Sequence, residues 1–214
     1  MSAAREEILA RIRAATADVS AGALRDATGV VPRSYRRGGG RSQQEVVALF
    51  CRRVAEYGAE VVVVSDPAAE ASAVLATHAA RRVGIASDLP GELRPTTVEL
   101  VEDRHLSPGE LDRVDAAYTT CEAACAETGT IALTGRGGQG RRALTLVPDL
   151  HVCVVLARDV VETVPELLDR LRPSARLGRP IVLVSGPSAT SDIELSRVEG
   201  VHGPRRLTVI VVDR

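Results

Sequence analysis

Apolar residues recur along the chain with two periods, one typical of helices and the other of buried strands. Residues 42–57 have helical spacing, and the apolar run at residues 61–64 follows them. The same order then repeats, with a helix predicted at residues 66–80 and a strand at residues 83–86. Helices that alternate with strands predict an α/β fold with a mostly parallel sheet.

Later apolar runs extend this pattern, and several are continuously apolar, as strands covered on both faces are. They predict strands at residues 97–101, 115–119, 130–133, 143–146, 151–156, 181–184 and 207–212. A further helix is predicted at residues 160–171. In such a sheet the functional loops are expected at the carboxyl ends of the strands.

The first 41 residues differ from the rest of the chain. Ile8, Leu9 and Ile12 have helical spacing and predict an amphipathic helix at residues 3–16. The following segment is rich in Gly and Arg and has too little apolar surface to fix one conformation. We therefore predict a helix and a mobile arm at residues 1–41, followed by one α/β domain at residues 42–214.

Composition excludes some classes of function. The formal net charge is −1 and the aromatic fraction is 2%, so the chain has neither a field that attracts nucleic acid nor platforms on which bases stack. The N-terminus lacks the apolar segment of a signal peptide, and no stretch approaches the ~18 apolar residues of a membrane span. We therefore expect a cytoplasmic protein that binds no nucleic acid and does not span a membrane.

The four cysteines, Cys51, Cys121, Cys125 and Cys153, include no CxxC pair. They therefore predict neither a zinc ribbon nor an iron–sulfur cluster, and we expect ordinary thiols. Cys121 and Cys125 are four residues apart and would share one face of a short helix, where a redox pair is the alternative to core thiols.

Residues 135–140 match the GxGxxG spacing of a dinucleotide site, and Asp159 lies about where a ribose-binding acid is sought. In such a site the glycines open a helix, whereas here a strand is predicted at residues 143–146. We therefore predict a hairpin loop and no cofactor cradle. Three arginines remain candidates for an anion contact: Arg136, Arg141 and Arg142.

Residues 185–194 (SGPSATSDIE) follow an apolar strand and predict a turn into a helix. Gly186 permits close approach of the backbone, and Ser191 with Glu194 has the spacing of a capping box. Free amides at such a turn suit a carboxylate or a phosphate. A capped helix start that binds no ligand is the alternative.

Two further polar segments adjoin strands: residues 127–130 (ETGT) and residues 202–205 (HGPR). His202 is a candidate proton donor or anion contact, and a structural hydrogen bond is the alternative. A metal site of Asp192, Glu194 and His202 would have no established ligand spacing, so we predict none.

The segment at residues 191–198 is long enough for only about two helical turns, a rise of roughly 12 Å. This rise is too short to return along a strand. We therefore predict that residues 207–212 run antiparallel to residues 181–184, which brings His202 near Ser188.

Glu127 and His202 are the catalytic candidates, with Asp192 or Glu194 orienting His202 and Arg205 supplying the counter-charge of an anion. The predicted ligand-binding residues are Glu127, Thr128, Gly129, Thr130, Arg142, Ser185, Gly186, Pro187, Ser188, Thr190, Asp192, Glu194, His202, Gly203 and Arg205.

Four segments together resemble the LUD (lactate utilization) family, and the resemblance covers most of the chain from about Ser42. They are AETGTIAL, LVPDLHVCVV, SGPSATSDIE and GVHGPRRLTVIVV, which begin at Ala126, Leu146, Ser185 and Gly200. The resemblance implies a three-layer α/β/α fold like that of the CoA transferases and of the ribose-phosphate and glucosamine-phosphate isomerases.

The resemblance also implies an accessory role in the bacterial oxidation of L-lactate to pyruvate, beside two iron–sulfur proteins encoded in the same operon. This chain would be the member without a cluster or another directly bound cofactor. We expect the loops at residues 185–194 and 202–205 to bind a small anion such as a carboxylate or phosphate, a nucleotide-like ligand, or a partner protein. The alternatives are a stand-alone CoA transferase or sugar-phosphate isomerase with Glu127 as base or nucleophile, and a scaffold that binds no ligand.

Overall fold

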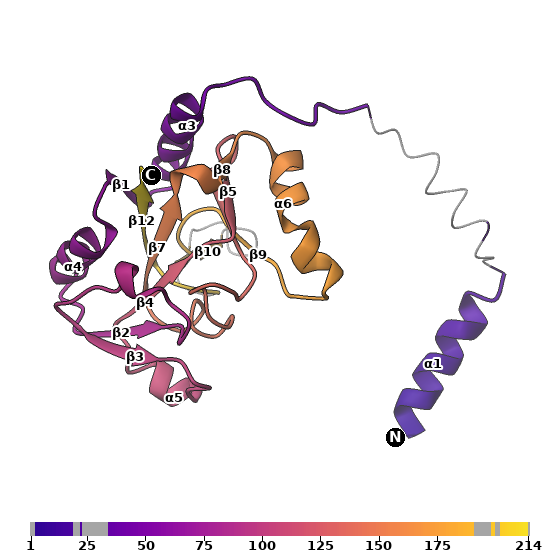
Figure 1. Ribbon diagram of the computed structural model, residues 1–214. Coiled ribbons are helices and arrows are strands. Elements are labelled where there is room, and N and C mark those ends of the chain that lie inside the picture. The colour runs from indigo at the N-terminus through magenta and orange to yellow at the C-terminus, as the bar shows by residue number, and fades with distance from the viewer. Residues whose placement is uncertain (1–2, 19–21, 23–33, 191–197, 200–201, 214) are drawn as a thin grey trace. The chain divides into compact units, whose positions relative to one another are not determined.

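The computed structural model describes residues 3–18, 22, 34–190, 198–199 and 202–213 (Figure 1). It consists of two units, Met1–Arg36 and Arg37–Arg214. In the first unit, α1 (Ala3–Ala15) has no buried residue. This helix confirms the one predicted at residues 3–16. No helix in the described ranges has the length and apolar character needed to cross a membrane.

A six-stranded sheet with the order β1-β12-β7-β4-β2-β3 forms the centre of the second unit. Every pairing described within it is parallel, as predicted. The strand bounds differ from the predicted ones by one or two residues. They are β1 (Glu60–Val64), β2 (Arg82–Ile85), β3 (Glu99–Glu102), β4 (Ala116–Thr120), β7 (Leu150–Leu156) and β12 (Arg206–Val212).

Helices cover both faces of this sheet (Figure 1). On one face α3 (Gln43–Glu56) packs Phe50 against β12, and on the other face α4 (Pro67–Thr77) packs Leu75. Phe50 and Leu75 are fully buried, and each stabilises the fold by about 1.5–3 kcal/mol relative to an exposed side chain. The continuous apolar runs of the central strands follow from this burial on two faces.

A second, four-stranded sheet packs beside α3 and has the order β8-β5-β6-β9. Its strands are β5 (Ala123–Cys125), β6 (Thr130–Leu133), β8 (Val160–Val161) and β9 (Val182–Val184). Helix α6 (Val164–Arg176) covers its outer face through Leu167 and Leu171. The predicted helix at residues 160–171 was therefore wrong at its start. Thr163 caps α6 and forms a capping box with Glu166, so residues 160–161 are left to form β8.

The predicted antiparallel pairing of residues 207–212 with residues 181–184 was wrong. Strand β12 lies between β1 and β7 and is parallel to both, whereas β9 pairs antiparallel with β6 in the second sheet. The physical reason is the difference in burial between the two strands. All of Leu207 to Val212 is buried, whereas Leu183 in β9 is 54% exposed. Only an edge strand of the smaller sheet accommodates that exposure.

The predicted strand at residues 143–146 was also wrong. These residues form successive turns, in which the N–H of Leu144 donates to the carbonyl of Arg141 and that of Leu146 to the carbonyl of Ala143. Leu144 is buried against Leu111 of the short helix α5 (Pro108–Leu111). The apolar run therefore reflects burial in a turn, which apolar periodicity does not distinguish from a strand. Two 3₁₀ turns, η1 (Gly91–Leu93) and η2 (Ala157–Asp159), are further short elements.

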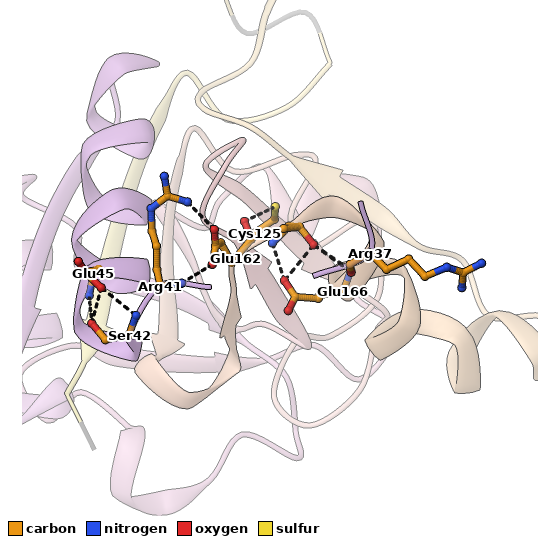
Figure 2. Close-up of polar contacts among 8 residues, drawn as sticks. Arg37, Arg41, Ser42, Glu45, Cys125, Glu162 and Glu166 are labelled. Carbon is orange, nitrogen blue, oxygen red and sulfur yellow. Dashed lines mark hydrogen bonds and ion pairs between the residues drawn. The ribbon is translucent and has the colours of Figure 1, made fainter. Parts of the chain in front are cut away.

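Residues 37–41, which we call the strap, were predicted to be mobile but are hydrogen-bonded to the domain (Figure 2). The N–H of Arg41 donates to Glu162 Oε2 at 2.9 Å, and its guanidinium pairs with the same carboxylate. The Thr163 hydroxyl donates to the carbonyl of Arg37 at 3.4 Å. These bonds are polar, which is why the lack of apolar residues did not predict them. Residues 19–21 and 23–33, which include most of the rest of the predicted arm, lie outside the described residues.

The turn into a helix predicted for residues 185–194 is described only in part. Residues 191–197 lie outside the described ranges, so the expected helix cannot be compared with the structure there. On either side of this gap, β10 (Ala189–Thr190) pairs antiparallel with β11 (Val198–Glu199). Residue 198, the last of the segment that was considered long enough for about two helical turns, belongs to a strand.

Candidate functional site

A cavity of about 230 Å³ lies where β7 and β12 of the main sheet meet β9 of the second sheet. His151 and Leu207, each the second residue of its strand, line its floor, so the cavity adjoins the amino ends of the main strands. The predicted position at the carboxyl ends was wrong for this site, because its loops are supplied by β9 and by the entry to β12. Seven predicted residues line it: Arg142, Ser185, Gly186, Pro187, Ser188, His202 and Gly203.

Two hydrogen bonds join the loop after β9 to the loop before β12. The N–H of Ser188 donates to the carbonyl of Pro204 at 2.8 Å, and the N–H of His202 donates to Ser188 Oγ at 3.1 Å. His202 and Ser188 therefore lie together, as predicted. Bonds between the loops bring them together, and the antiparallel strand pair proposed from the sequence does not exist.

Gly186 fixes the position of the first loop. Its φ is +96°, and a Cβ at this position would lie 2.6 Å from the Cβ of Tyr57 at the end of α3. Only glycine combines this backbone conformation with such a close approach. The loop can therefore rest directly on the end of α3.

The ETGT segment lies behind the cavity and does not line it. A chain of hydroxyl hydrogen bonds runs from Thr128 to Thr130 at 2.7 Å and from Thr130 to Ser185 at 2.8 Å. Gly129 has φ +60°, and a Cβ there would come within 2.9 Å of Arg53. Glu127 is half-buried, and its N–H donates to the carbonyl of Glu162 at 3.1 Å. This segment supports the Ser185 loop from outside the cavity.

Arg142 supplies a positive charge at the cavity. Its side chain is exposed, and one terminal nitrogen, NH1, donates to the carbonyl of Thr145 at 3.1 Å and to its hydroxyl at 3.2 Å. The guanidinium is thus oriented by its own turn. A planar guanidinium held in one orientation is well suited to a carboxylate or phosphate.

His151 also lines the cavity, and the sequence analysis did not single it out. The residue is 2% exposed, and Nε2 lies 2.8 Å from the hydroxyl of Thr119. Burial, and to a lesser extent the charge of Arg142, lowers the pKa of His151 to about 4, so the ring is neutral at pH 7. The available signal was a histidine within the apolar run LHVCVVL.

The described lining of the cavity combines a guanidinium, two imidazoles and several hydroxyls, and it contains no carboxylate. This set of groups is rich in hydrogen-bond donors and carries positive charge. The described residues therefore offer a small anion both counter-charge and hydrogen bonds.

The LUD domain family model matches residues 42–212. The chain belongs to the LUD domain family. Lactate utilization protein C of Deinococcus radiodurans is 47% identical over 172 residues, which cover 80% of this chain and 81% of that protein. Lactate utilization protein C of Shouchella clausii is 32% identical over 114 residues, which cover 52% of this chain and 49% of that protein.

A crystal structure of a DUF162 family protein from Deinococcus radiodurans has the same fold, with a TM-score of 0.69 and 39% identity. The match covers 81% of this chain and 99% of that one. The resemblance inferred from the four motifs is thus confirmed, and so is the α/β fold.

Besides the ETGT segment, four further predicted site residues lie outside this cavity or outside the described residues. Arg205 lines a neighbouring cavity of about 520 Å³, where its Nε donates to Asp149 Oδ1 at 2.5 Å. Thr190 belongs to β10, while Asp192 and Glu194 lie outside the described ranges. Within those ranges, no group of three or more His, Cys, Asp or Glu residues could hold a metal ion.

The GxGxxG segment of the LUD domain is a loop, as predicted, but not a hairpin, because residues 143–146 form no strand. Its amides are engaged by the chain itself: the N–H groups of Gly137 and Gly138 donate to the Asp88 carboxylate at 3.0 and 3.1 Å. In a dinucleotide site such amides meet a pyrophosphate. Here the Asp88 carboxylate accepts the hydrogen bonds that a pyrophosphate would accept in such a site.

The predicted helix carrying Cys121 and Cys125 was wrong, because Cys125 belongs to β5 and Cys121 precedes it. The Cys121 thiol hydrogen-bonds with Cys153 instead, and this bond together with burial raises the pKa of Cys121 well above its usual value. A protonated thiol is a poor nucleophile and a poor metal ligand. The four cysteines are free thiols.

Proposed function

We propose that this LUD domain is an accessory subunit of a bacterial system that oxidises L-lactate to pyruvate, and that it binds a small organic anion in the cavity beside Arg142. The observation that carries this proposal is a donor-rich cavity with a guanidinium and no carboxylate in its described lining. The relative named lactate utilization protein C, which aligns over most of both chains, supports the link to lactate.

The size of the cavity favours a short acid over a nucleotide-bearing ligand. Sites for drug-sized molecules occupy ~300–1,000 Å³, whereas this cavity measures about 230 Å³. A three-carbon acid fits within such a space, while CoA would extend far beyond it. This comparison favours an acid-binding subunit over a stand-alone CoA transferase.

Oxidation of lactate to pyruvate removes two electrons and two protons. We propose that two iron–sulfur partner proteins accept these electrons, and that this chain binds the acid within the assembly. The role of Glu127 is then structural, since the ETGT segment adjoins the Ser185 loop through Thr130 and lies outside the cavity.

The proposal is tested by titrating the purified chain with L-lactate, pyruvate, inorganic phosphate and CoA in a calorimeter. We expect Arg142→Ala to weaken binding of the three-carbon acids about tenfold to a hundredfold, because a charge-assisted hydrogen bond is worth ~1.5–3 kcal/mol. Arg136→Ala is the matched control, since Arg136 is an exposed arginine that does not line the cavity. Its affinity should equal that of the unmodified chain.

Failure to bind any of these ligands, with the fold intact by circular dichroism, would refute ligand binding and favour a scaffold. Equal loss of affinity in both arginine variants would refute the assigned cavity. Turnover of CoA esters or sugar phosphates by the isolated chain, abolished by Glu127→Gln, would establish the enzyme alternative instead.

A further inference from the structure

His151 and Thr119 form a buried pair whose outer side faces the cavity. Strands β7 and β4 are parallel, with His151 opposite Ala117, so Thr119 lies two residues further along on the same face. The Thr119 side chain is completely buried, and its hydroxyl lies 2.8 Å from His151 Nε2. His151 is also one of the residues that line the cavity.

The direction of this hydrogen bond follows because the buried Thr119 hydroxyl proton requires an acceptor. Among the described residues, the imidazole is the single hydrogen-bond partner of the Thr119 hydroxyl. If Nε2–H donated to Thr119, the threonine proton would be left in the interior without an acceptor, which is costly. Thr119 therefore donates its proton to Nε2, and the neutral ring carries its own proton on Nδ1.

No described residue forms a hydrogen bond with Nδ1, and no fully buried side-chain nitrogen or oxygen of the described residues lacks a partner, so Nδ1 keeps some accessible surface. The ring is neutral because burial lowers its pKa to about 4. The Nδ1–H group is therefore a donor held in one orientation at the wall of the cavity, close to the charge of Arg142. Thr119 acts through the ring as a positioning residue, and His151 is the group that meets the ligand.

The three hydroxyls in the described lining are already engaged in hydrogen bonds, and that of Thr145 bonds with Arg142. Ser188 Oγ already accepts from the N–H of His202, and Ser185 Oγ is engaged with Thr130. A 2-oxo acid presents a carboxylate and a carbonyl oxygen, which only accept hydrogen bonds. A 2-hydroxy acid brings in addition a hydroxyl proton that needs an acceptor.

Resting on the proposed function of this cavity, we infer that it selects 2-oxo acids over the corresponding 2-hydroxy acids, with His151 Nδ1–H donating to the 2-oxo oxygen and Arg142 pairing with the carboxylate. The preferred ligand class is thus that of the oxidised product, pyruvate. A site that leaves a buried polar group unpaired discriminates strongly against the ligand that causes it. We expect pyruvate to bind about tenfold more tightly than L-lactate.

Two measurements on the full chain test this inference. The first is the long-range ¹H–¹⁵N NMR spectrum of the histidine rings at pH 7, with His151 assigned through His151→Gln. We expect a protonated Nδ1 and an unprotonated Nε2 for His151. The opposite tautomer would overturn the inference.

The second measurement is the ratio of the pyruvate and L-lactate affinities in Thr119 variants. Thr119→Val removes the donor at nearly constant volume and should reduce the preference to within about twofold, whereas Thr119→Ser keeps the hydroxyl and should retain it. Thermal unfolding of each variant checks the fold. If Thr119→Val does not fold, the serine variant and the NMR spectrum still decide the matter.

The outcomes separate this inference from the function on which it rests. Equal affinities for the two acids, or a preference for L-lactate, would overturn the selectivity and leave anion binding intact. Absence of binding by both acids would overturn anion binding and the selectivity together.

Discussion

At the scale of single residues, Gly39 lies against a buried carboxylate. The Glu162 side chain is 5% exposed and accepts hydrogen bonds from the backbone and side chain of Arg41. A Cβ at Gly39 would lie 1.7 Å from Glu162 Oε2, so a side chain at residue 39 would force either the strap or the carboxylate to shift. Gly40 has no atom within 4 Å of its Cβ position.

We therefore predict that Gly39→Ala lowers the free energy of unfolding by about 1–3 kcal/mol, because overpacking displaces either the strap or the carboxylate. Gly40→Ala, one residue away, should change it by less than about 0.5 kcal/mol. Urea unfolding monitored by circular dichroism measures both. Equal stabilities for the two variants would show that the strap does not hold Glu162 in solution.

At the scale of secondary-structure elements, the start of α6 sets the arrangement of the second sheet. The Thr163 side chain accepts from the N–H of Glu166, and the Glu166 carboxylate accepts from the N–H and the hydroxyl of Thr163. The same hydroxyl contacts the strap at the carbonyl of Arg37. This cap ends β8 and directs α6 across the outer face of β5.

Thr163→Ala should lower the free energy of unfolding by about 1–2 kcal/mol through loss of the N-cap. Thr163→Ser keeps the capping oxygen, so most of that stability should remain. Chemical denaturation of the two variants side by side provides the comparison. A serine variant as unstable as the alanine variant would assign the effect to the buried methyl group and contradict the cap.

At the scale of the whole domain, the candidate site exists because two sheets meet. The main sheet contributes His151 and Leu207 from adjacent strands, and the second sheet contributes β9 and the loop that follows it. The His151 imidazole at this junction is almost completely buried. Its protonation is therefore coupled to the stability of the domain as a whole.

We predict that His151 makes the domain less stable as the pH falls from about 6.5 to about 4. Burial lowers the folded-state pKa to about 4, while the unfolded value is ~6.5, so the unfolded chain binds the proton first. The stability from a neutral His151 is complete above about pH 6.5 and is lost as the pH falls through about 4. Linkage limits this loss to the order of 3 kcal/mol.

Denaturation between pH 7 and pH 4 for the unmodified chain and for His151→Gln isolates this term, since the other titrating groups are shared. The variant should lose less stability than the unmodified chain over the interval. Parallel pH profiles would show that the ring is solvated or already charged at neutral pH.

Local pattern was sufficient to predict much of this protein. The apolar periods located most strands of the main sheet to within two residues, because burial on both faces imposes a continuous apolar run. Four motifs were sufficient to identify the family. The SGPS and HGPR segments were correctly predicted to lie together, although hydrogen bonds between the two loops join them and the predicted strand pair does not.

The tertiary structure decided what depends on partners distant in sequence. An apolar run has the same sequence pattern in a central strand, in an edge strand such as β9, and in a buried turn such as the one around Leu144, so the pattern does not distinguish them. The strap looked unconstrained because its anchor, Glu162, lies 121 residues further along the chain. His151 was not singled out in the sequence, because the cavity beside it forms only where β7, β12 and β9 converge. The sequence by itself therefore determined the strands of the main sheet and the family, and packing between distant segments determined the site.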